Sequence, residues 1–293
     1  MCRHAIVLAI VVALSPTVFA TTWYVDRSNT SGIEDGTTWP TAFATIQAGI
    51  DAASEGDEVI VAEGTYFENV YFDGKDIVLR STDPTNPDVV NNTIIDGNEA
   101  GTVVRFSSTQ SPDCVLSGFT ITNGKDEWCG GIDGNSSLVT IQNNVVTANV
   151  SEGGGGILFC NGTIQNNTIC GNWSEEGSAL AHCDGTIENN TVCDNWSEEG
   201  GALLGCKGLI QGNTIASNHT ERLGAALSGC VSTIRNCIIW GNTSPDGVQL
   251  QDCSTPSYSC IQDWVNGGIG NISTDPEFVD PPNGDYHLQP DSP

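Results

Sequence analysis

The sequence predicts an all-β chain that is wound as a right-handed parallel β-helix. Three observations lead to this prediction: a repeat of about 23 residues, three short apolar or β-branched pieces in each repeat, and equivalent residues that recur in columns. Six consecutive units have lengths of 25, 23, 23, 23, 24 and 25 residues, and they span 120–144, 145–167, 168–190, 191–213, 214–237 and 238–262. The hexapeptide NWSEEG, which begins at Asn172 and again at Asn195, is one corner of this repeat.

The apolar pieces within each unit are too short for helices. In the unit 168–190 they are 168–170, 179–181 and 186–188, and Gly, Asn and Asp separate them. Gly and Asn at this density disfavour helix. Three strands and three bends therefore make one turn of a solenoid, which stacks on the next at roughly 4.8 Å, the ordinary strand spacing.

Stacked turns require ladders of equivalent residues, and the sequence contains them. We expect the core to be three aliphatic columns: Ile121, Val146, Ile169, Val192, Ile215 and Ile239; Ile141, Ile164, Ile187, Ile210 and Ile234; and Ile132, Ile157, Leu180, Leu203, Leu227 and Leu250. Two further columns are Asn149, Asn172, Asn195, Asn218 and Asn242, and Asn144, Asn167, Asn190 and Asn213. We expect the first of these to form a corner, because Asn tolerates left-handed backbone and satisfies exposed backbone groups there.

The segments before the repeats predict a cap. Phe43, Ile46, Ile50 and Ala53 follow helical spacing, so 41–54 is predicted as a short amphipathic helix that covers the open end of the solenoid. Strands are predicted within 57–72 and 76–81. The predicted organisation is a signal peptide (1–20), a cap with first rungs (21–118), regular rungs (119–262) and a closing segment (263–293).

The first twenty residues and the net charge limit the kinds of function that this protein can have. Arg3, an apolar run from Ala5 to Leu14 and a small-residue end at Ala20 are typical of a secretory signal peptide, and no later run approaches the length of a membrane span. Without Arg3, 8 basic residues stand against 36 acidic ones, a formal charge of 8 − 36 = −28. Such a surface repels nucleic acid. We expect a secreted or cell-surface monomer whose partner is an extracellular polysaccharide.

Two flanking stretches carry a family resemblance. Residues 39–68 resemble the N-terminal cap and first rung of the pectate-lyase-like right-handed β-helix superfamily. The stretch DPEFVDPPNGDYHLQPDSP (275–293) resembles the closing motif of secreted bacterial β-helix proteins of the choice-of-anchor type, in which the chain usually continues, so a truncated reading frame is expected. The superfamily includes pectate lyases, polygalacturonases and pectin esterases, but the NTD, DD and GHG signatures of polygalacturonases are absent.

An acidic and aromatic corner is the predicted contact surface. Trp173, Trp196 and His219 share one column and are predicted to contact sugar rings, although mutual packing of the rings is the competing interpretation. Next to them lie Glu152, Glu175, Glu198 and Glu221. Like charges one rung apart repel by roughly 0.9 kcal/mol even in water. The carboxylates therefore either splay into solvent or hold calcium, which prefers oxygen ligands.

The cysteines form columns as well. Cys160, Cys183, Cys206, Cys230 and Cys253 make one column, and Cys170 and Cys193 make a pair. Rung spacing falls within the Cα–Cα range of a disulfide, so one or two disulfides are expected, and the remaining thiols act as small buried hydrophobes. Zinc is disfavoured because no CxxC or HxxxH spacing occurs.

Three functions remain open from the sequence. The first is a secreted β-helix protein that binds or processes a polysaccharide without a standard catalytic constellation. The second is a calcium-dependent polysaccharide lyase; an enzyme of this fold is expected to be a lyase or a glycoside hydrolase. The third is a structural stalk or adhesin. The basic residues in the rungs, Lys125, Lys207, Arg222 and Arg235, lie in no recognisable lyase setting.

Overall fold

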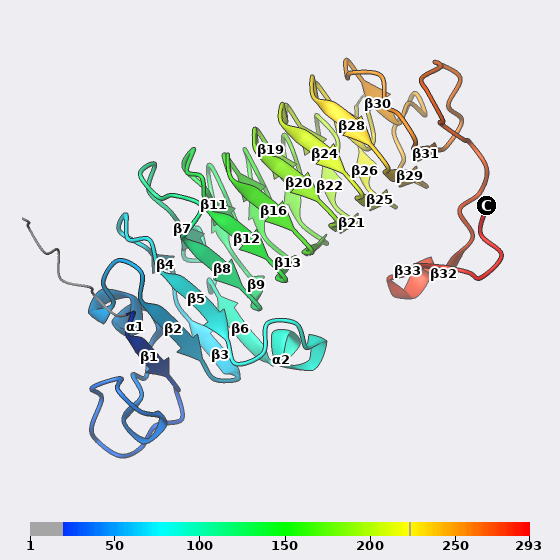
Figure 1. Cartoon of the computed structure of the whole chain (residues 1–293). Coiled ribbons are helices and arrows are strands. Elements are labelled where there is room, and N and C mark those ends of the chain that lie inside the picture. The colour runs from blue at the N-terminus through cyan, green and yellow to red at the C-terminus, as the bar shows by residue number, and fades with distance from the viewer. Residues whose placement is uncertain (1–19, 223) are drawn as a thin grey trace, which may run out of the picture.

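The structure, a computed structural model, describes residues 20–222 and 224–293 and shows a parallel β-solenoid (Figure 1). Its strands form two nine-stranded sheets, one eight-stranded sheet and one five-stranded sheet, and every pairing within them is parallel. The predicted fold is therefore confirmed. The predicted signal peptide lies almost wholly outside the described residues. No described helix is long and apolar enough to cross a bilayer.

The solenoid has four parallel sheets, which we call A to D; sheets A, B and C extend along most of it, and sheet D occupies five consecutive rungs. Sheet A contains β1 (Thr22–Val25), β2 (Glu58–Val61), β5 (Val78–Ser81), β8 (Val115–Ser117), β12 (Thr140–Gln142), β16 (Thr163–Gln165), β20 (Thr186–Glu188), β24 (Leu209–Gln211) and β28 (Thr233–Arg235). Sheet B contains β3 (Gly64–Phe67), β6 (Thr93–Asp96), β9 (Thr120–Thr122), β13 (Val145–Thr147), β17 (Thr168–Cys170), β21 (Thr191–Cys193), β25 (Thr214–Ala216), β29 (Ile238–Trp240) and β31 (Cys260–Ile261).

The two other sheets are built from two-residue strands. Sheet C contains β4 (Val70–Tyr71), β7 (Val104–Arg105), β11 (Ile132–Asp133), β15 (Ile157–Leu158), β19 (Leu180–Ala181), β23 (Leu203–Leu204), β27 (Leu227–Ser228) and β30 (Leu250–Gln251). Sheet D contains β10 (Lys125–Asp126), β14 (Val150–Ser151), β18 (Trp173–Ser174), β22 (Trp196–Ser197) and β26 (His219–Thr220). The prediction of three strands per turn missed sheet D, because a Trp-Ser pair is too short to show a strand pattern.

The three predicted aliphatic columns form the core. In-register pairs such as Ile164 with Ile187 and Ile169 with Val192 stack along the axis, and the members of all three columns are buried. In parallel register, equivalent side chains of successive rungs pack directly against one another. Each turn therefore buries its apolar side only against the turns on either side of it.

Both asparagine columns are buried hydrogen-bonded ladders. The side-chain oxygen of Asn172 accepts from the backbone N–H of Asn149 at 3.1 Å and from its side-chain amide at 3.0 Å, while Asn172 Nδ2 donates to the Val146 carbonyl at 3.0 Å. The expected left-handed backbone is one residue earlier, at positions such as Ala148 and Asp194, both with positive φ. In each rung the Asn of the ladder makes the hydrogen bonds, and the residue before it has the left-handed backbone that forms the corner.

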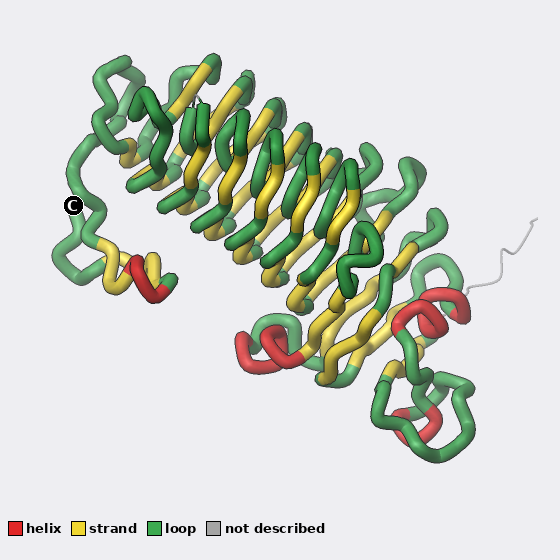
Figure 2. The backbone as a smooth tube through the Cα atoms, turned by 180° about the vertical axis from the view of Figure 1, so that it is seen from behind, coloured by secondary structure: helices red, strands yellow, loops and turns green. Residues whose placement is uncertain are grey.

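Both α-helices lie in the N-terminal part of the chain, and the short 3-10 helix η2 (Pro281–Asn283) lies near the C-terminus (Figure 2). The helix α1 (Ile46–Ala52) is shorter than predicted because the side chain of Thr45 caps it by accepting from Ala48 N, and a 3-10 turn, η1 (Trp39–Thr41), precedes it. Ile46 and Ile50 are buried in the common core, as a cap requires. A second helix, α2 (Pro87–Asn92), was not predicted.

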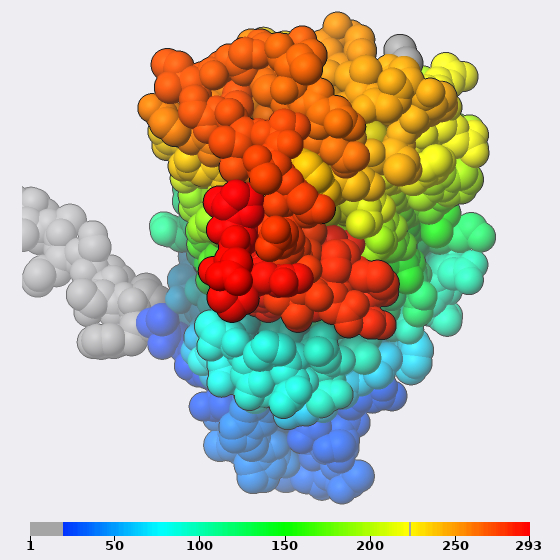
Figure 3. Space-filling view, turned by 90° about the vertical axis from the view of Figure 1, so that its right-hand side faces the viewer, coloured from blue at the N-terminus to red at the C-terminus, as the bar shows by residue number. Residues whose placement is uncertain are grey.

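The closing segment folds back on the outside of the solenoid. β32 (Phe278–Asp280), η2 (Pro281–Asn283) and β33 (Asp285–Leu288) form an antiparallel hairpin. Phe278 and Tyr286 pack on Cys193 and Ala216 of sheet B, and Figure 3 shows the segment lying against the body of the molecule. The structure does not test the predicted anchor motif.

The expected disulfides are not formed, since all eleven cysteines of the described chain are free. Stacked parallel residues keep their Cβ atoms near the strand spacing of roughly 4.8 Å, beyond the usual Cβ separation of about 3.8 Å in a disulfide. The thiols instead lie within weak hydrogen-bonding distance of backbone carbonyls, as Cys183 does with Ile157 at 3.8 Å. Burial raises the pKa of Cys160 to about 12, so this thiol is inert at neutral pH.

Candidate functional site

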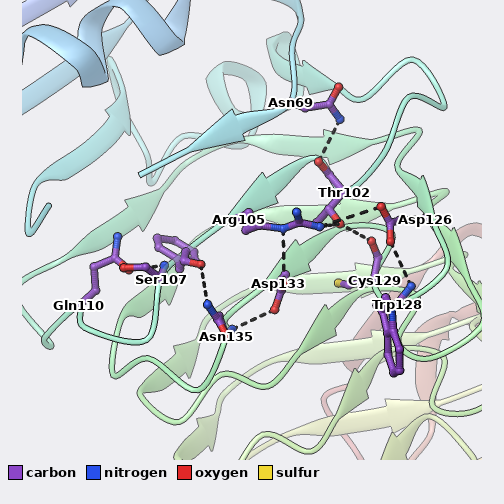
Figure 4. A network of polar contacts seen from close by, with 11 residues as sticks. Asn69, Thr102, Arg105, Ser107, Gln110, Asp126, Trp128, Cys129, Asp133 and Asn135 are labelled. Carbon is purple, nitrogen blue, oxygen red and sulfur yellow. Dashed lines mark hydrogen bonds and ion pairs between the residues drawn. The ribbon is translucent and has the colours of Figure 1, made fainter. Parts of the chain in front are cut away.

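An open cavity of about 440 Å³ lies over the early rungs of sheet C (Figure 4). Its wall includes Arg105 and Asp126, together with polar side chains from neighbouring rungs: Asn69, Thr102 and Asn135. An arginine and a carboxylate on one cavity wall are the usual components of a site that handles a polar substrate.

Arg105 is held between two carboxylates. Its Nε lies 3.5 Å from Asp133 Oδ2, and its Nη2 lies 4.0 Å from Asp126 Oδ2. Nη2 also donates to Thr102 Oγ1 at 3.0 Å, and Thr102 in turn donates to the Cys129 carbonyl at 2.7 Å. About half of the Arg105 side chain remains exposed, so the guanidinium is both fixed and reachable.

The register of sheet C brings these residues together. Tyr71, Arg105 and Asp133 occupy successive positions in β4, β7 and β11, one residue after the buried column. Side chains alternate between faces along a strand, so this position points outward. Farther along sheet C, the same outward position holds Leu158 and Ala181, which are buried with Cys129 in a small apolar cluster.

The strand β10, which follows β9 after a short connection, carries Asp126. Gly124 allows this connection to close, because a Cβ there would lie 1.9 Å from the Gly130 carbonyl oxygen. Asp126 Oδ1 accepts from the backbone N–H of Trp128 at 3.1 Å, which fixes the carboxylate in an Asx-type turn. The close backbone approach therefore sets both Asp126 and the exposed Trp128 in place.

The two carboxylates that face Arg105 differ in environment. Burial raises the pKa of Asp133, which the hydrogen bond from Asn135 N and the charge of Arg105 oppose, and the charge of Asp126 raises it further. Asp133 therefore keeps its proton to higher pH than a free aspartate. Carboxyl groups in unequal environments are the arrangement that acid–base chemistry uses.

Two further hollows adjoin the cavity. Asp126 also borders a hollow of about 520 Å³ with Glu127, Glu152 and Glu175, and these three glutamates border a third hollow of about 310 Å³ with Trp128. Each hollow shares lining residues with the next, so the three hollows form a run of neighbours along the solenoid. We call this run the groove.

The predicted sugar-contacting residues do form one column. Trp173, Trp196 and His219 are register partners in sheet D, with ring centroids 5.8 and 6.3 Å apart. Both tryptophans are half-buried, and the indole nitrogen of Trp173 is buried without a partner. Mutual packing accounts for this column, although Trp173 also borders the second hollow. Its role in sugar contact stays a prediction.

The predicted metal ligands Glu152, Glu175, Glu198 and Glu221 follow the paired residues of sheet D and are all exposed. Within the described residues, no group of three or more His, Cys, Asp or Glu side chains converges to hold a metal ion. One neighbouring glutamate, Glu199, is paired with Arg222 at 2.6 Å. Calcium binding stays a prediction, and the arrangement favours solvated carboxylates.

The sequence interpretation missed Arg105, Asp126 and Asp133, and also a second aromatic pair. Phe159 and His182 stack with ring centroids 5.4 Å apart. Their signal was present, since they are separated by one period of 23 residues and each precedes a column cysteine by one residue. The Arg105 site had no such signal, because its residues recur in no column.

Comparison with family models supports the β-helix fold over part of the chain. The family model described as "Right handed beta helix region" matches residues 157–269. No curated protein matches the chain. Among solved structures, a pectin methylesterase from Aspergillus niger in deglycosylated form is similar with a TM-score of 0.43 and 15% identity, covering 88% of this chain and 83% of that one. Two pectin methylesterase structures with bound hexasaccharides have a TM-score of 0.44 and 10% identity, covering 93% of this chain and 99% of those.

Proposed function

We propose that this protein is secreted or displayed on the cell surface and processes a polysaccharide in the groove. The observation that carries the proposal is the placement of Arg105 and Asp126 in the wall of a cavity that continues into two further hollows. A run of hollows fits a chain of several sugar units better than it fits a single small molecule. An arginine between two carboxylates gives this run a reactive centre.

The chemistry that suits this centre is hydrolysis. The fixed guanidinium of Arg105 is placed to stabilise negative charge that develops on a substrate oxygen. Asp126 borders the cavity and can act as base or nucleophile, while Asp133 holds Arg105 in position. An ester or a glycosidic bond of a polysaccharide is therefore the proposed target.

The test is a product assay on the full chain with neutral, acidic and amino-sugar polysaccharides. New reducing ends report glycoside hydrolysis, released acid or alcohol reports ester hydrolysis, and ultraviolet-absorbing products report a lyase. We expect Arg105→Ala to lower turnover by roughly 10²–10³-fold, the usual cost of losing one transition-state donor. Arg235→Ala, an arginine in a distant rung that pairs with Gln211, is the matched control.

The alternatives predict different results. Retention on a polysaccharide with no product of any kind would make the protein a binder. Neither retention nor product would favour the structural stalk. Ultraviolet-absorbing products that require calcium would establish the lyase and overturn hydrolysis.

A further inference from the structure

The third hollow of the groove combines rings and carboxylates. Its lining includes Trp128, which is 66% exposed, and the stacked rings of Phe159 and His182. Its remaining charged lining residues are four glutamates, which are Glu127, Glu152, Glu175 and Glu176. Neither Lys nor Arg is among the lining residues of this hollow.

Phe159 and His182 occupy a strained backbone position. Both have φ of 52°, in the left-handed region that bulky residues avoid. The same corner holds Gly205, Gly229 and Asp252 in later rungs, with φ of 64°, 63° and 52°. Glycine adopts this conformation without strain, whereas a side chain here costs of order 1–3 kcal/mol.

The strain is not compensated by core packing. The ring of Phe159 is 38% exposed, and Phe159 belongs to no buried cluster. An exposed ring in a strained position, where later rungs have glycine or aspartate, is an outlier of the kind found at ligand contacts. Exposed rings contact the flat CH faces of sugars and also attract cations.

The charge of the hollow selects the kind of sugar. Four carboxylates in its lining repel a uronic acid, and they attract a protonated amine. We propose that this hollow is a binding subsite for an amino-sugar unit of a cationic polysaccharide, with the sugar on Phe159 and Trp128 and its ammonium group facing the glutamates. The proposal rests on the proposed function, since it names the substrate class of the same groove.

The test is calorimetric titration of the full chain with three hexamers: glucosamine, N-acetylglucosamine and galacturonate. At mildly acidic pH, where the amines are protonated, we expect the glucosamine hexamer to bind about tenfold or more tightly than the acetylated one. Added salt should weaken this binding, because screening acts on exposed charges. Equal affinity for the acetylated hexamer, or no binding of the glucosamine hexamer, would overturn the proposal.

Two variants locate the binding. Phe159→Gly removes the ring and relieves the backbone, so it should unfold at the same or a higher temperature while losing about tenfold in affinity for the glucosamine hexamer. Tyr258→Gly is the matched control, since Tyr258 is also exposed and has φ of 49° but lies outside the groove. Glu152→Gln combined with Glu175→Gln should reduce both the affinity and its salt dependence. Unchanged binding in Phe159→Gly would place the ligand elsewhere.

The failure of this inference is distinguishable from failure of the proposed function. If no polysaccharide is turned over but the glucosamine hexamer binds and Phe159→Gly weakens it, the subsite stands and the hydrolytic centre falls. If a neutral or acidic polysaccharide is turned over and Phe159→Gly leaves its KM unchanged, the hydrolytic centre stands and the amino-sugar subsite falls.

Discussion

The regular rungs and the early rungs of this solenoid use the same backbone for different purposes. In the rungs from β16 to β24, the 23-residue period places like against like, such as Ile164 on Ile187 and Trp173 on Trp196. In the rungs from β4 to β11 the period is broken, and unlike residues meet, with Arg105 between Tyr71 and Asp133. A strict repeat cannot place an acid opposite a base, because every residue faces its own copy.

This difference locates the chemistry. Homotypic ladders stabilise the solenoid through stacked aliphatic columns and through asparagine hydrogen bonds. Contacts between unlike residues make a charged site, and the structure places that site in the early rungs, where Arg105 of β7, Asp126 of β10 and Asp133 of β11 meet. Damage to the regular rungs should therefore appear as lost stability, and damage to the early rungs should appear as lost activity.

The largest expected effect is in a regular rung. Asn195→Ala removes an acceptor for Asn172 N–H at 3.0 Å and a donor to the Ile169 carbonyl at 2.9 Å, both in the interior. Two buried backbone groups lose partners, each at a cost of roughly 1–3 kcal/mol, so the free energy of unfolding should fall by about 2–6 kcal/mol. Urea unfolding measures this, with exposed Asn91→Ala as the control. An equal small loss in both variants would contradict the ladder's role.

The extent to which the sequence predicts this molecule follows from the same comparison. The repeat of about 23 residues makes three features predictable from the sequence: the aliphatic columns, the strand positions of sheets A to C and the NWSEEG corner. Arg105 and Asp133 are 28 positions apart, and nothing in the period pairs them; only the observed register does. The bend before Asn149 was placed one residue late for a related reason, since the ladder repeats Asn while its predecessor varies among Ala, Gly, Asp and Ser.

The second prediction concerns the early rungs. Asp133 has a pKa raised by burial, so the folded chain binds this proton more tightly than the unfolded chain does. Its contribution to stability therefore decreases as pH rises from the ordinary aspartate value through the raised one. The Asp133→Asn variant does not show this pH-dependent loss of stability, because its side chain does not ionise. The variant also lacks the ion pair between Asp133 and the exposed Arg105, which is worth up to about 1 kcal/mol.

The stability of Asp133→Asn relative to the original chain should therefore improve between about pH 4 and pH 7. Urea unfolding at the two pH values measures the change. Asp126→Asn tests the same effect from the other side: it removes a charge that raises the pKa of Asp133, so the loss of stability with rising pH should become smaller. A relative stability that worsens with pH would show that the ion pair outweighs the burial.

The third prediction concerns two stacked cysteines whose pKa values differ because of their surroundings. Cys170 and Cys193 are register partners on the outer face of sheet B. A hydrogen bond from Cys193 lowers the pKa of Cys170 to about 7, and the same contact, with burial, raises the pKa of Cys193. Iodoacetamide should therefore modify one thiol of the pair with a midpoint near pH 7, while buried Cys160 stays unmodified.

Peptide mass spectrometry after alkylation identifies the site. Cys193→Ser keeps a hydroxyl donor, which is stronger than a thiol, and should leave the midpoint of Cys170 near its original value, whereas Cys193→Ala removes the donor and should move the midpoint upward. Alkylation of both members at the same pH would mean that the repeat imposes equal environments on its cysteines, as it does on its aliphatic columns.

The smallest effect is expected at the glutamate column. Glu175 and Glu198 are exposed, and among the described residues no metal-holding group forms around them. Their repulsion is therefore screened, and the double change Glu175→Gln with Glu198→Gln should raise the free energy of unfolding by less than about 1 kcal/mol. Millimolar calcium should shift the melting temperature of both proteins equally. A rise of several degrees in the original chain that the double variant lacks would instead make this column a cation site. The regular rungs would then contain a cation site, formed by identical carboxylates on successive rungs.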